Sequence, residues 1–342
     1  MSDKPNHAMQ RKLLYLFTRT PLHVGAGSSV GAIDQPIVRE RHTGFPVIPP
    51  TTLKGVFADG WADDLVPNDK GEKVRVWFEK KEGQVAEHVS KEAAWLFGSD
   101  DANNSWAGAL QFSEGKLLAF PIRSGKGSFA WITCPLMLRR AVRDGVLKAE
   151  HLPSFPSDKD ADGKALFGKT GPLAIGDKLV LEEYTLTHAG ELPNGLGIAL
   201  QSLLDGDEVW REVTSRLVIV SDGMMSFFAA SACEVAQHVR ISDETGTAAV
   251  GALFNQENVP SETLFYSVLH CYRERGRGKK ENELRPAKDA AKAFVRRVHD
   301  KPFQFGGDAS TGLGFCTVEV EGGDELLQTD NQQPKPQANL SK

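Results

Sequence analysis

Apolar and polar positions alternate along this chain in short runs, and the spacing of the runs changes between that of strands and that of helices. Residues 13–20 are apolar and aromatic enough for a first strand. Apolar residues at helical spacing follow Thr51 and Thr52, which we expect to cap a helix. We expect further strands in 108–122, 179–188, 217–221, 263–270 and 315–320, and further helices in 92–98, in the later part of 131–146, in 194–216 and in 283–299. This irregular alternation predicts an α+β fold with helices on one face of the sheet rather than a doubly wound parallel sheet.

Two β-like runs, 238–242 and 248–254, flank a short turn that contains glycine, and this arrangement predicts a β-hairpin. The largely polar stretch 67–90 is expected to be an insertion, and 151–178, which is rich in Pro, Gly and Asp, is expected to be a loop. The polar segment 328–342 carries two prolines and is expected to be a disordered tail. We therefore expect a single domain over residues 1–327.

Composition narrows the class of protein and its partners. Of the 342 residues, 40% are hydrophobic and 25% are charged, as in ordinary globular proteins. The net charge of −5 counts against a generally basic nucleic-acid binder, so a polymer site would need local basic residues on an acidic body. The four cysteines lack zinc-site spacing, and the chain has no apolar leader and no apolar stretch of bilayer length. These features predict a cytoplasmic protein with reduced thiols and no membrane contact.

Two glycine-rich loops lie near the two ends of the chain. The first runs from 21 to 34 and begins PLHVGAG, and the second is GGDASTGLG at 306–314. Glycine lets a backbone turn tightly and approach a bulky ligand with its N–H groups pointing outward. Neither a dinucleotide-binding nor a Walker-A spacing is present. We expect the two loops to meet and to hold a phosphate-bearing polymer.

Residues with functional chemistry lie in or near these loops, and each also has a plain structural interpretation. Asp34 follows a run of small residues, where a solvated loop carboxylate is the commoner case. His23 begins the same loop, where a structural role is commoner than a catalytic one. Helix N-terminal N–H groups together with Thr51, Thr52 and Lys54 are suited to bind phosphate.

Basic residues elsewhere leave alternatives open. The turn that contains Arg123 and Lys126 is either a simple β-turn or a loop that contacts phosphate. The basic run 273–280 and the cations of the helix near 288–297 are interpreted as solvated surfaces. We expect one basic face built from Lys54, Arg123, Lys126 and the second glycine loop.

Several motifs together resemble the RAMP superfamily of CRISPR proteins, and more closely the Cmr-type backbone subunits of type III-B effector complexes. They occur in the family's order over most of the chain: TPLHVGAG at 20–27, IDQPI at 33–37, HTGFPVIP at 42–49, LKGV at 53–56, FPIRS at 120–124, WITCP at 131–135 and GGDASTG at 306–312. Each motif is weak alone, but the ordered set is specific. The resemblance implies a ferredoxin-like (RRM-type) palm with helical insertions and an inserted β-hairpin thumb at about 233–265.

The resemblance also implies a function and a set of partners. Family members polymerise along a guide RNA (crRNA) with other subunits and cleave complementary target RNA at regular intervals. The family's catalytic aspartate corresponds to Asp34, which would hold Mg²⁺ or another divalent cation, and its loop histidine corresponds to His23. Glu257 is a further catalytic candidate. The residues expected to bind RNA are Thr51, Thr52, Lys54, Arg123, Lys126, Gly306, Gly307, Ser310, Thr311, Gly312 and Gly314.

The chain departs from the family pattern at a few positions. Leu313 stands where the family often has a basic residue in the last glycine loop, and Ala58 and Asp59 stand where another basic residue often follows the helix lysine. Asn258 stands near the thumb in place of an aromatic residue. Two alternatives therefore stay open, a guide-RNA scaffold that does not cleave and a small-molecule enzyme that binds a nucleotide.

Overall fold

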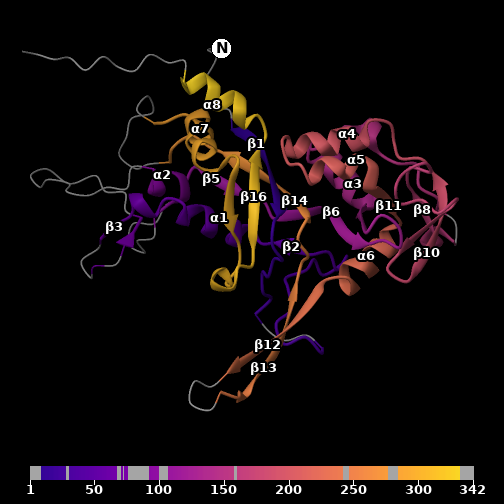
Figure 1. Ribbon diagram of the computed structural model, residues 1–342. Helices are drawn as coiled ribbons and strands as arrows, with labels where there is room; N and C mark the ends of the chain where they lie inside the picture. Colours follow the sequence, from indigo (N-terminus) through magenta and orange to yellow (C-terminus); the bar gives the residue numbers. More distant parts are fainter. Residues whose placement is uncertain are drawn as a thin grey trace, which may run out of the picture.

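The computed structural model describes residues 9–27, 31–67, 71, 73–75, 92–99, 107–157, 160–241, 246–275 and 284–331. Its central feature in that part of the chain is a large, mostly antiparallel sheet, as expected for an α+β fold (Figure 1). The strands of this sheet are β1 (Gln10–Thr18), β2 (Val47–Ile48), β5 (Leu110–Phe112), β6 (Gly115–Arg123), β7 (Phe129–Thr133), β8 (Lys164–Leu166), β9 (Lys178–Leu181), β10 (Tyr184–Gly190), β11 (Leu217–Val220), β14 (Leu264–Cys271), β15 (Lys301–Gln304) and β16 (Phe315–Val320). They follow the order β15-β16-β1-β14-β6-β7-β11-β8-β10-β9, while β2 pairs with β6 and β5 pairs with β14.

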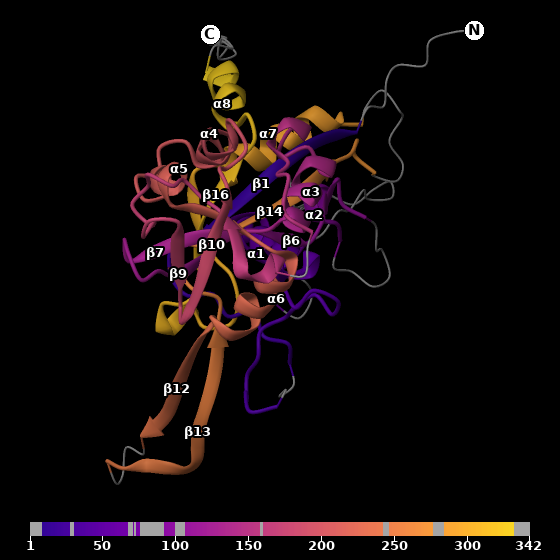
Figure 2. The same ribbon diagram turned by 90° about the vertical axis from the view of Figure 1, so that its right-hand side faces the viewer.

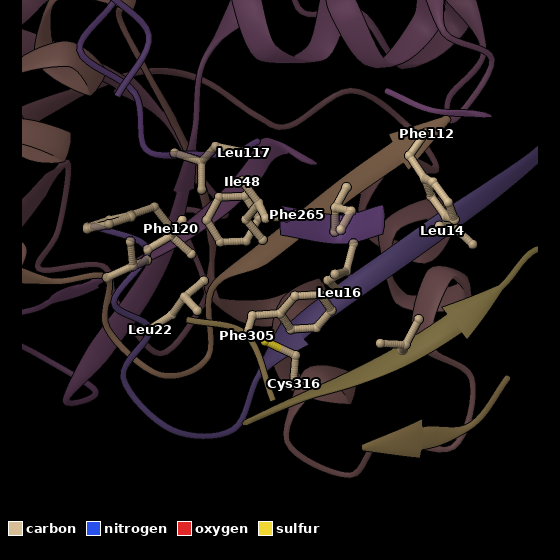
Figure 3. Packing of buried hydrophobic residues seen from close by; sticks show 14 of the residues in the cluster. Leu14, Leu16, Leu22, Ile48, Phe112, Leu117, Phe120, Phe265, Phe305 and Cys316 are labelled. Carbon is tan, nitrogen blue, oxygen red and sulfur yellow. The ribbon is translucent and has the colours of Figure 1, made fainter. Parts of the chain in front are cut away.

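Both faces of the sheet are buried, and β1 shows why. Leu14 and Leu16 point into one core, whereas Tyr15 and Phe17 point into a second core, because successive side chains of a strand alternate between faces. A strand that is covered on both sides has a continuous apolar sequence, and this made 13–20 recognisable. Figure 3 shows both leucines in the first core, with Leu16 next to Phe305 and Leu14 next to Phe112.

Helices cover both faces, which corrects the expectation of helices on one face only. Those described are α1 (Pro50–Asp59), α2 (Ala93–Phe97), α3 (Pro135–Arg143), α4 (Leu196–Gln201), α5 (Val213–Arg216), α6 (Asp222–Ser231), α7 (Ala287–Val298) and α8 (Gly323–Asn331). The first core is closed by α1, α2 and α7, and the second by α4, α5 and one side of α3 (Figure 1). The second layer is needed because the face with Tyr15, Phe17 and Trp131 is itself apolar.

The predicted hairpin is confirmed and is longer than expected. Strands β12 (Glu234–Ile241) and β13 (Ala248–Asn258) pair antiparallel, with Glu234 opposite Asn258 and Val239 opposite Leu253. We call this hairpin the thumb. It projects from the body of the protein in both views (Figures 1 and 2). Residues 242–245 of its turn lie outside the described residues.

Several local predictions were incomplete. The expected loop 151–178 contains β8, and the expected single strand 179–188 is two strands, β9 and β10, separated at Glu182, whose φ is 49°. The sequence pattern did not reveal α6, β15 or α8, and α8 includes residues 328–331 of the expected tail. Residues 332–342, and all of the 67–90 insertion except 67, 71 and 73–75, lie outside the described part. None of the helices described is long and apolar enough to cross a membrane.

Candidate functional site

The two glycine-rich loops meet in the structure, as the sequence predicted. The backbone N–H of Gly314 donates to the carbonyl of Pro21 (2.8 Å), and that of Phe315 donates to Oγ1 of Thr20 (3.0 Å). Gly306 has a φ of +90°, and a Cβ atom built on it would lie 2.1 Å from the carbonyl oxygen of His23. A side chain at position 306 would therefore separate the loops, and glycine is required there.

The root of the thumb joins the two loops as a third segment. Leu22 and Val259 exchange backbone hydrogen bonds (2.8 and 2.9 Å), which ties the first loop to the chain just beyond β13. The side chain of Gln256, which is 3% exposed, donates to Oδ2 of Asp308 in the second loop (2.9 Å). Three segments that are distant in the sequence thus converge where the thumb leaves the body, and in Figure 2 the first loop descends beside the thumb.

Asp34 is exposed at this junction and is held by the thumb. Its Oδ2 accepts a hydrogen bond from the backbone N–H of Asn255 (2.9 Å), and its own N–H donates to Oδ1 of Asn255 (2.7 Å). The Nδ2 group of Asn255 also donates to the carbonyl of Ala32 (3.0 Å). The carboxylate is therefore placed at the surface without being desolvated.

His23 lies beneath the loop and is largely buried. Its Nδ1 is 2.7 Å from the carbonyl oxygen of Glu257. Because a carbonyl can only accept, Nδ1 carries the proton, and Nε2 is the acceptor in the neutral ring. A Cβ at Gly25 would lie 2.9 Å from Nε2, so the ring fits only because residue 25 has no side chain. This geometry suits an orienting role for His23.

Glu257 is also buried and engaged. Its carboxylate accepts hydrogen bonds from the guanidinium of Arg39 (2.5 Å) and from the backbone N–H of Ile37 (3.1 Å). Arg39 also donates to the carbonyls of Gly44 and Ala229 (2.7 Å each). Only 7% of the Glu257 surface is exposed, and its contacts suit a role in positioning the first loop. A contact between Glu257 and a reacting group stays a prediction.

The charge of Arg39 also reaches Cys233, at the start of the thumb. The Arg39 guanidinium is 3.3 Å from the Sγ atom. Burial raises the pKa of the Cys233 thiol to about 11, although the charge of Arg39 opposes this rise. The thiol is therefore protonated at neutral pH and is a poor metal ligand.

The metal donor that the sequence analysis predicted at this junction is the exposed carboxylate of Asp34. No group of three or more His, Cys, Asp or Glu side chains that could hold a metal occurs in the part of the chain that the structure describes. Mg²⁺ is usually bound by one or two carboxylates together with water and substrate phosphates. Asp34 fits a site of that kind, which would need ligands from bound RNA, and does not fit a site made by the protein alone.

The later part of helix α1 packs against the segment that leads into the second loop. Gly60 lies against Phe303, Phe57 contacts both Phe303 and Phe305, and β15 ends two residues before Gly306. The helix begins at Pro50, so the predicted threonine cap is wrong. Proline is preferred at this first helical position, since its missing N–H would have no partner there. Thr51, Thr52 and Lys54 instead belong to the first turn, where Thr51 and Lys54 are exposed.

The second loop presents a polar surface. Gly307, Ser310, Thr311 and Gly312 are exposed, and Gly312 has a φ of +81°. The hydroxyl of Thr311 donates to the carbonyl of Asp308 (2.9 Å), which steadies the turn. Contact between RNA and the residues predicted to bind it in this loop stays a prediction.

Arg123 and Lys126 lie in the β6–β7 turn, which is bonded to β9 through the N–H of Gly125 and the carbonyl of Val180 (2.9 Å). The guanidinium of Arg123 pairs with Glu182 (2.7 Å), and the ammonium of Lys126 donates to the carbonyl of Ala174 (2.6 Å). A hollow of about 410 Å³ beside Arg123 is also lined by three carboxylates, Glu182, Glu234 and Glu262. These contacts do not support the single basic face that we expected, and phosphate binding by this turn stays a prediction.

The sequence analysis did not single out Arg39, Asn255, Gln256 or Asp308. A signal for three of them was present, because Asn255 and Gln256 are polar residues within a predicted hairpin and Asp308 lies within a glycine loop. Their partners could not be predicted from the sequence, since the Asn255 contact with Asp34 spans 221 residues.

Comparisons with known proteins agree with this architecture. The sequence model of the RAMP superfamily matches residues 16–317. The CRISPR system Cmr endoribonuclease Cmr4 of Pyrococcus furiosus is 29% identical over 317 residues, which cover 92% of this chain and 96% of that protein. The crystal structure of oligomeric Cmr4 from Pyrococcus furiosus has a TM-score of 0.60 at 25% identity and covers 92% of this chain and 98% of that one. A chain of the type III-B Cmr-beta complex bound to cognate target RNA shares the fold, with a TM-score of 0.63, 18% identity and coverage of 93% and 98%.

Proposed function

The chain belongs to the RAMP superfamily, and from this membership we propose that it is a backbone subunit of a type III-B CRISPR ribonucleoprotein that cleaves target RNA at Asp34. Its partners would be guide RNA, target RNA, further copies of itself and the other subunits of the complex. The similarity to an endoribonuclease over 92% of the chain supports this proposal. The observation that carries the catalytic assignment is that two glycine loops and the thumb root converge around one exposed carboxylate.

The described surface suits an RNA backbone. Outward N–H groups of glycine-rich turns and a helix N-terminus bind phosphate without reading bases, so base pairing with the guide would determine which target is bound. The thumb rises next to Asp34 and would interrupt the stack of the paired strands there. A sugar freed from A-form stacking can turn its 2′-hydroxyl toward the adjacent phosphorus.

The proposed reaction is a transesterification. The 2′-oxygen would form a bond to phosphorus and lose its proton, while the bond from phosphorus to the 5′-oxygen breaks and that oxygen gains a proton. The products would be a 2′,3′-cyclic phosphate and a 5′-hydroxyl. Asp34 would hold a divalent cation, Mg²⁺ or another, which would neutralise phosphate charge when RNA supplies the remaining ligands. His23 would keep the loop, and with it Asp34, in place from below.

The substitution Asp34→Ala in the assembled complex tests the catalytic assignment. We expect single-turnover cleavage of a labelled, guide-complementary RNA to fall by about 100-fold or more, because the charge stabilisation that a bound cation supplies is worth several kcal/mol. Guide and target binding should stay within about twofold. Asp59→Ala, which removes an exposed carboxylate at the end of α1, is the matched control and should cleave normally.

Two results would change the proposal. Unchanged cleavage by Asp34→Ala would leave the chain as a guide-RNA scaffold without catalytic function at this site. If the wild-type complex still cleaves in excess EDTA, the proposed divalent cation is wrong. The role of Asp34 is then decided by the Asp34→Ala substitution alone.

A further inference from the structure

We propose that Asn255 is a positioning residue that sets the location of the Asp34 carboxylate from the thumb strand β13; this inference rests on the proposed function of Asp34. The two arms of the first loop are hydrogen-bonded at its base, where the N–H of Ala26 donates to the carbonyl of Pro36 (2.8 Å), but Gly31 and Ala32, nearer to Asp34, have no side chains that could anchor this part of the loop. Gly31 also has a φ of +63°, a conformation that glycine adopts without strain. The position of Asp34 therefore depends on contacts from outside the loop.

Each polar group of Asn255, on its side chain and on its backbone, makes a hydrogen bond to residues 32–35. Its side-chain oxygen accepts from the N–H of Asp34 and its side-chain nitrogen donates to the carbonyl of Ala32. Its backbone N–H donates to the Asp34 carboxylate, and its carbonyl accepts from the N–H of Gln35 (3.1 Å). One of these four hydrogen bonds reaches the Asp34 carboxylate itself, and the other three hold the backbone of Ala32, Asp34 and Gln35 around it.

The next residue on the same face of β13 continues this attachment. Glu257 lies two positions after Asn255, so both side chains point to one face of the strand, and Glu257 binds Ile37 and Arg39, just after the first loop. Gln256, between them, points to the other face and binds Asp308 of the second loop. Strand β13 therefore holds one glycine loop with each face.

This arrangement couples Asp34 to the thumb. Asn255 lies within β13, the same strand that extends to the far part of the hairpin (Figure 1), so a shift of the thumb moves the groups that bind Asp34. The carboxylate would reach its productive position only when the thumb is seated. Asparagine suits this task because its amide offers both an acceptor for the N–H of Asp34 and a donor for the carbonyl of Ala32, whereas an ionised carboxylate could only accept.

Two substitutions in the assembled complex, with guide RNA and labelled target, test this inference. For Asn255→Ala we expect single-turnover cleavage to fall about tenfold while the target Kd changes by less than twofold, because the carboxylate is present but misplaced. For Asn255→Ser, whose neutral hydroxyl can still accept a hydrogen bond from the N–H of Asp34, we expect a smaller fall of about threefold, again with an unchanged Kd. Asn194→Ala, at an exposed position before α4, is the matched control.

Each outcome separates this inference from the proposed function. If Asp34→Ala abolishes cleavage but Asn255→Ala cleaves within twofold of wild type, Asn255 has no positioning role and the proposed function stands. If Asp34→Ala cleaves normally, the proposed function is wrong. A parallel fall in cleavage, target binding and thermal midpoint for Asn255→Ala, with no recovery in Asn255→Ser, would mean only a structural role and would also overturn the inference.

Discussion

At the scale of single residues, position 306 shows how a glycine brings two distant loops together. Its φ of +90° and the 2.1 Å between a built Cβ and the carbonyl of His23 exclude every other residue type without movement of the backbone. The neighbouring Gly307 has an ordinary φ and open space around it. The two adjacent glycines therefore have different reasons to be glycine.

Gly306→Ala should lower the free energy of unfolding by about 2–4 kcal/mol, because conformational strain and steric overlap add. The measurement is chemical denaturation of the purified chain, read as a change of midpoint. Gly307→Ala is the adjacent control and should change stability by less than about 0.5 kcal/mol. Equal effects from the two substitutions would contradict the close packing of the loops.

At the scale of elements, α8 is attached to the sheet through a buried histidine. His299 lies between Glu319 of β16 (Nδ1 to Oε2, 3.1 Å) and Asp324 of α8 (Nε2 to Oδ1, 3.3 Å). Burial, together with the nearby charges of four aspartates, Asp300, Asp324, Asp205 and Asp207, raises the pKa of Glu319 to about 7. The ionised form of Glu319 is thus disfavoured in the folded protein.

The raised pKa of Glu319 predicts how stability depends on pH. The folded state keeps a proton that the unfolded state has released, so the contribution of this group is full below its ordinary pKa of 4.5 and is lost as pH rises through about 7. The loss is on the order of 3 kcal/mol. The thermal unfolding midpoint of the wild-type protein should therefore fall between pH 5 and 8. Glu319→Gln should reduce this fall, whereas Glu321→Gln, at an exposed site, should leave it unchanged. If the midpoint of Glu319→Gln falls with pH as steeply as that of wild type, other groups cause the pH dependence.

At the scale of the whole molecule, a chain of net charge −5 must bind RNA through a local surface. Lys54 is exposed in the first turn of α1, and the later residue Phe57 of this helix contacts Phe305, which directly precedes the second glycine loop, so we expect Lys54 to contribute one phosphate contact. Each contact releases counterions, and the logarithm of the binding constant therefore falls linearly with the logarithm of salt concentration.

Lys54→Ala should reduce the salt slope of guide-RNA binding by about 0.7 for each bound copy, the value for one contact to a single strand. Filter binding between 50 and 300 mM salt measures this slope. Lys148→Ala, which removes an exposed lysine after α3, is the control. An unchanged slope for Lys54→Ala would place the RNA path away from α1.

Much of the fold was predictable, because local spacing follows local geometry. The apolar run at 13–20, the hairpin around 248–254 and the strand at 315–320 were recognised, since period and turn composition depend only on near neighbours. Short elements such as β8 and β15 were missed because three or four residues carry too little pattern. Helix α6 was missed although Ser221 caps it, because the sequence was interpreted there as the end of a strand.

For the candidate site, the sequence alone determined which residues were candidates: the small-residue loop before Asp34, the second glycine loop and the family motifs. Only the tertiary structure decided how they act together. In the structure Asn255 contacts Asp34, which lies 221 residues away in the sequence. Glu257 is buried and paired with Arg39, and Arg123 lines a hollow together with three carboxylates. The physical reason is that a turn's conformation follows from its own residues, whereas a partner across the fold depends on where every intervening strand is packed.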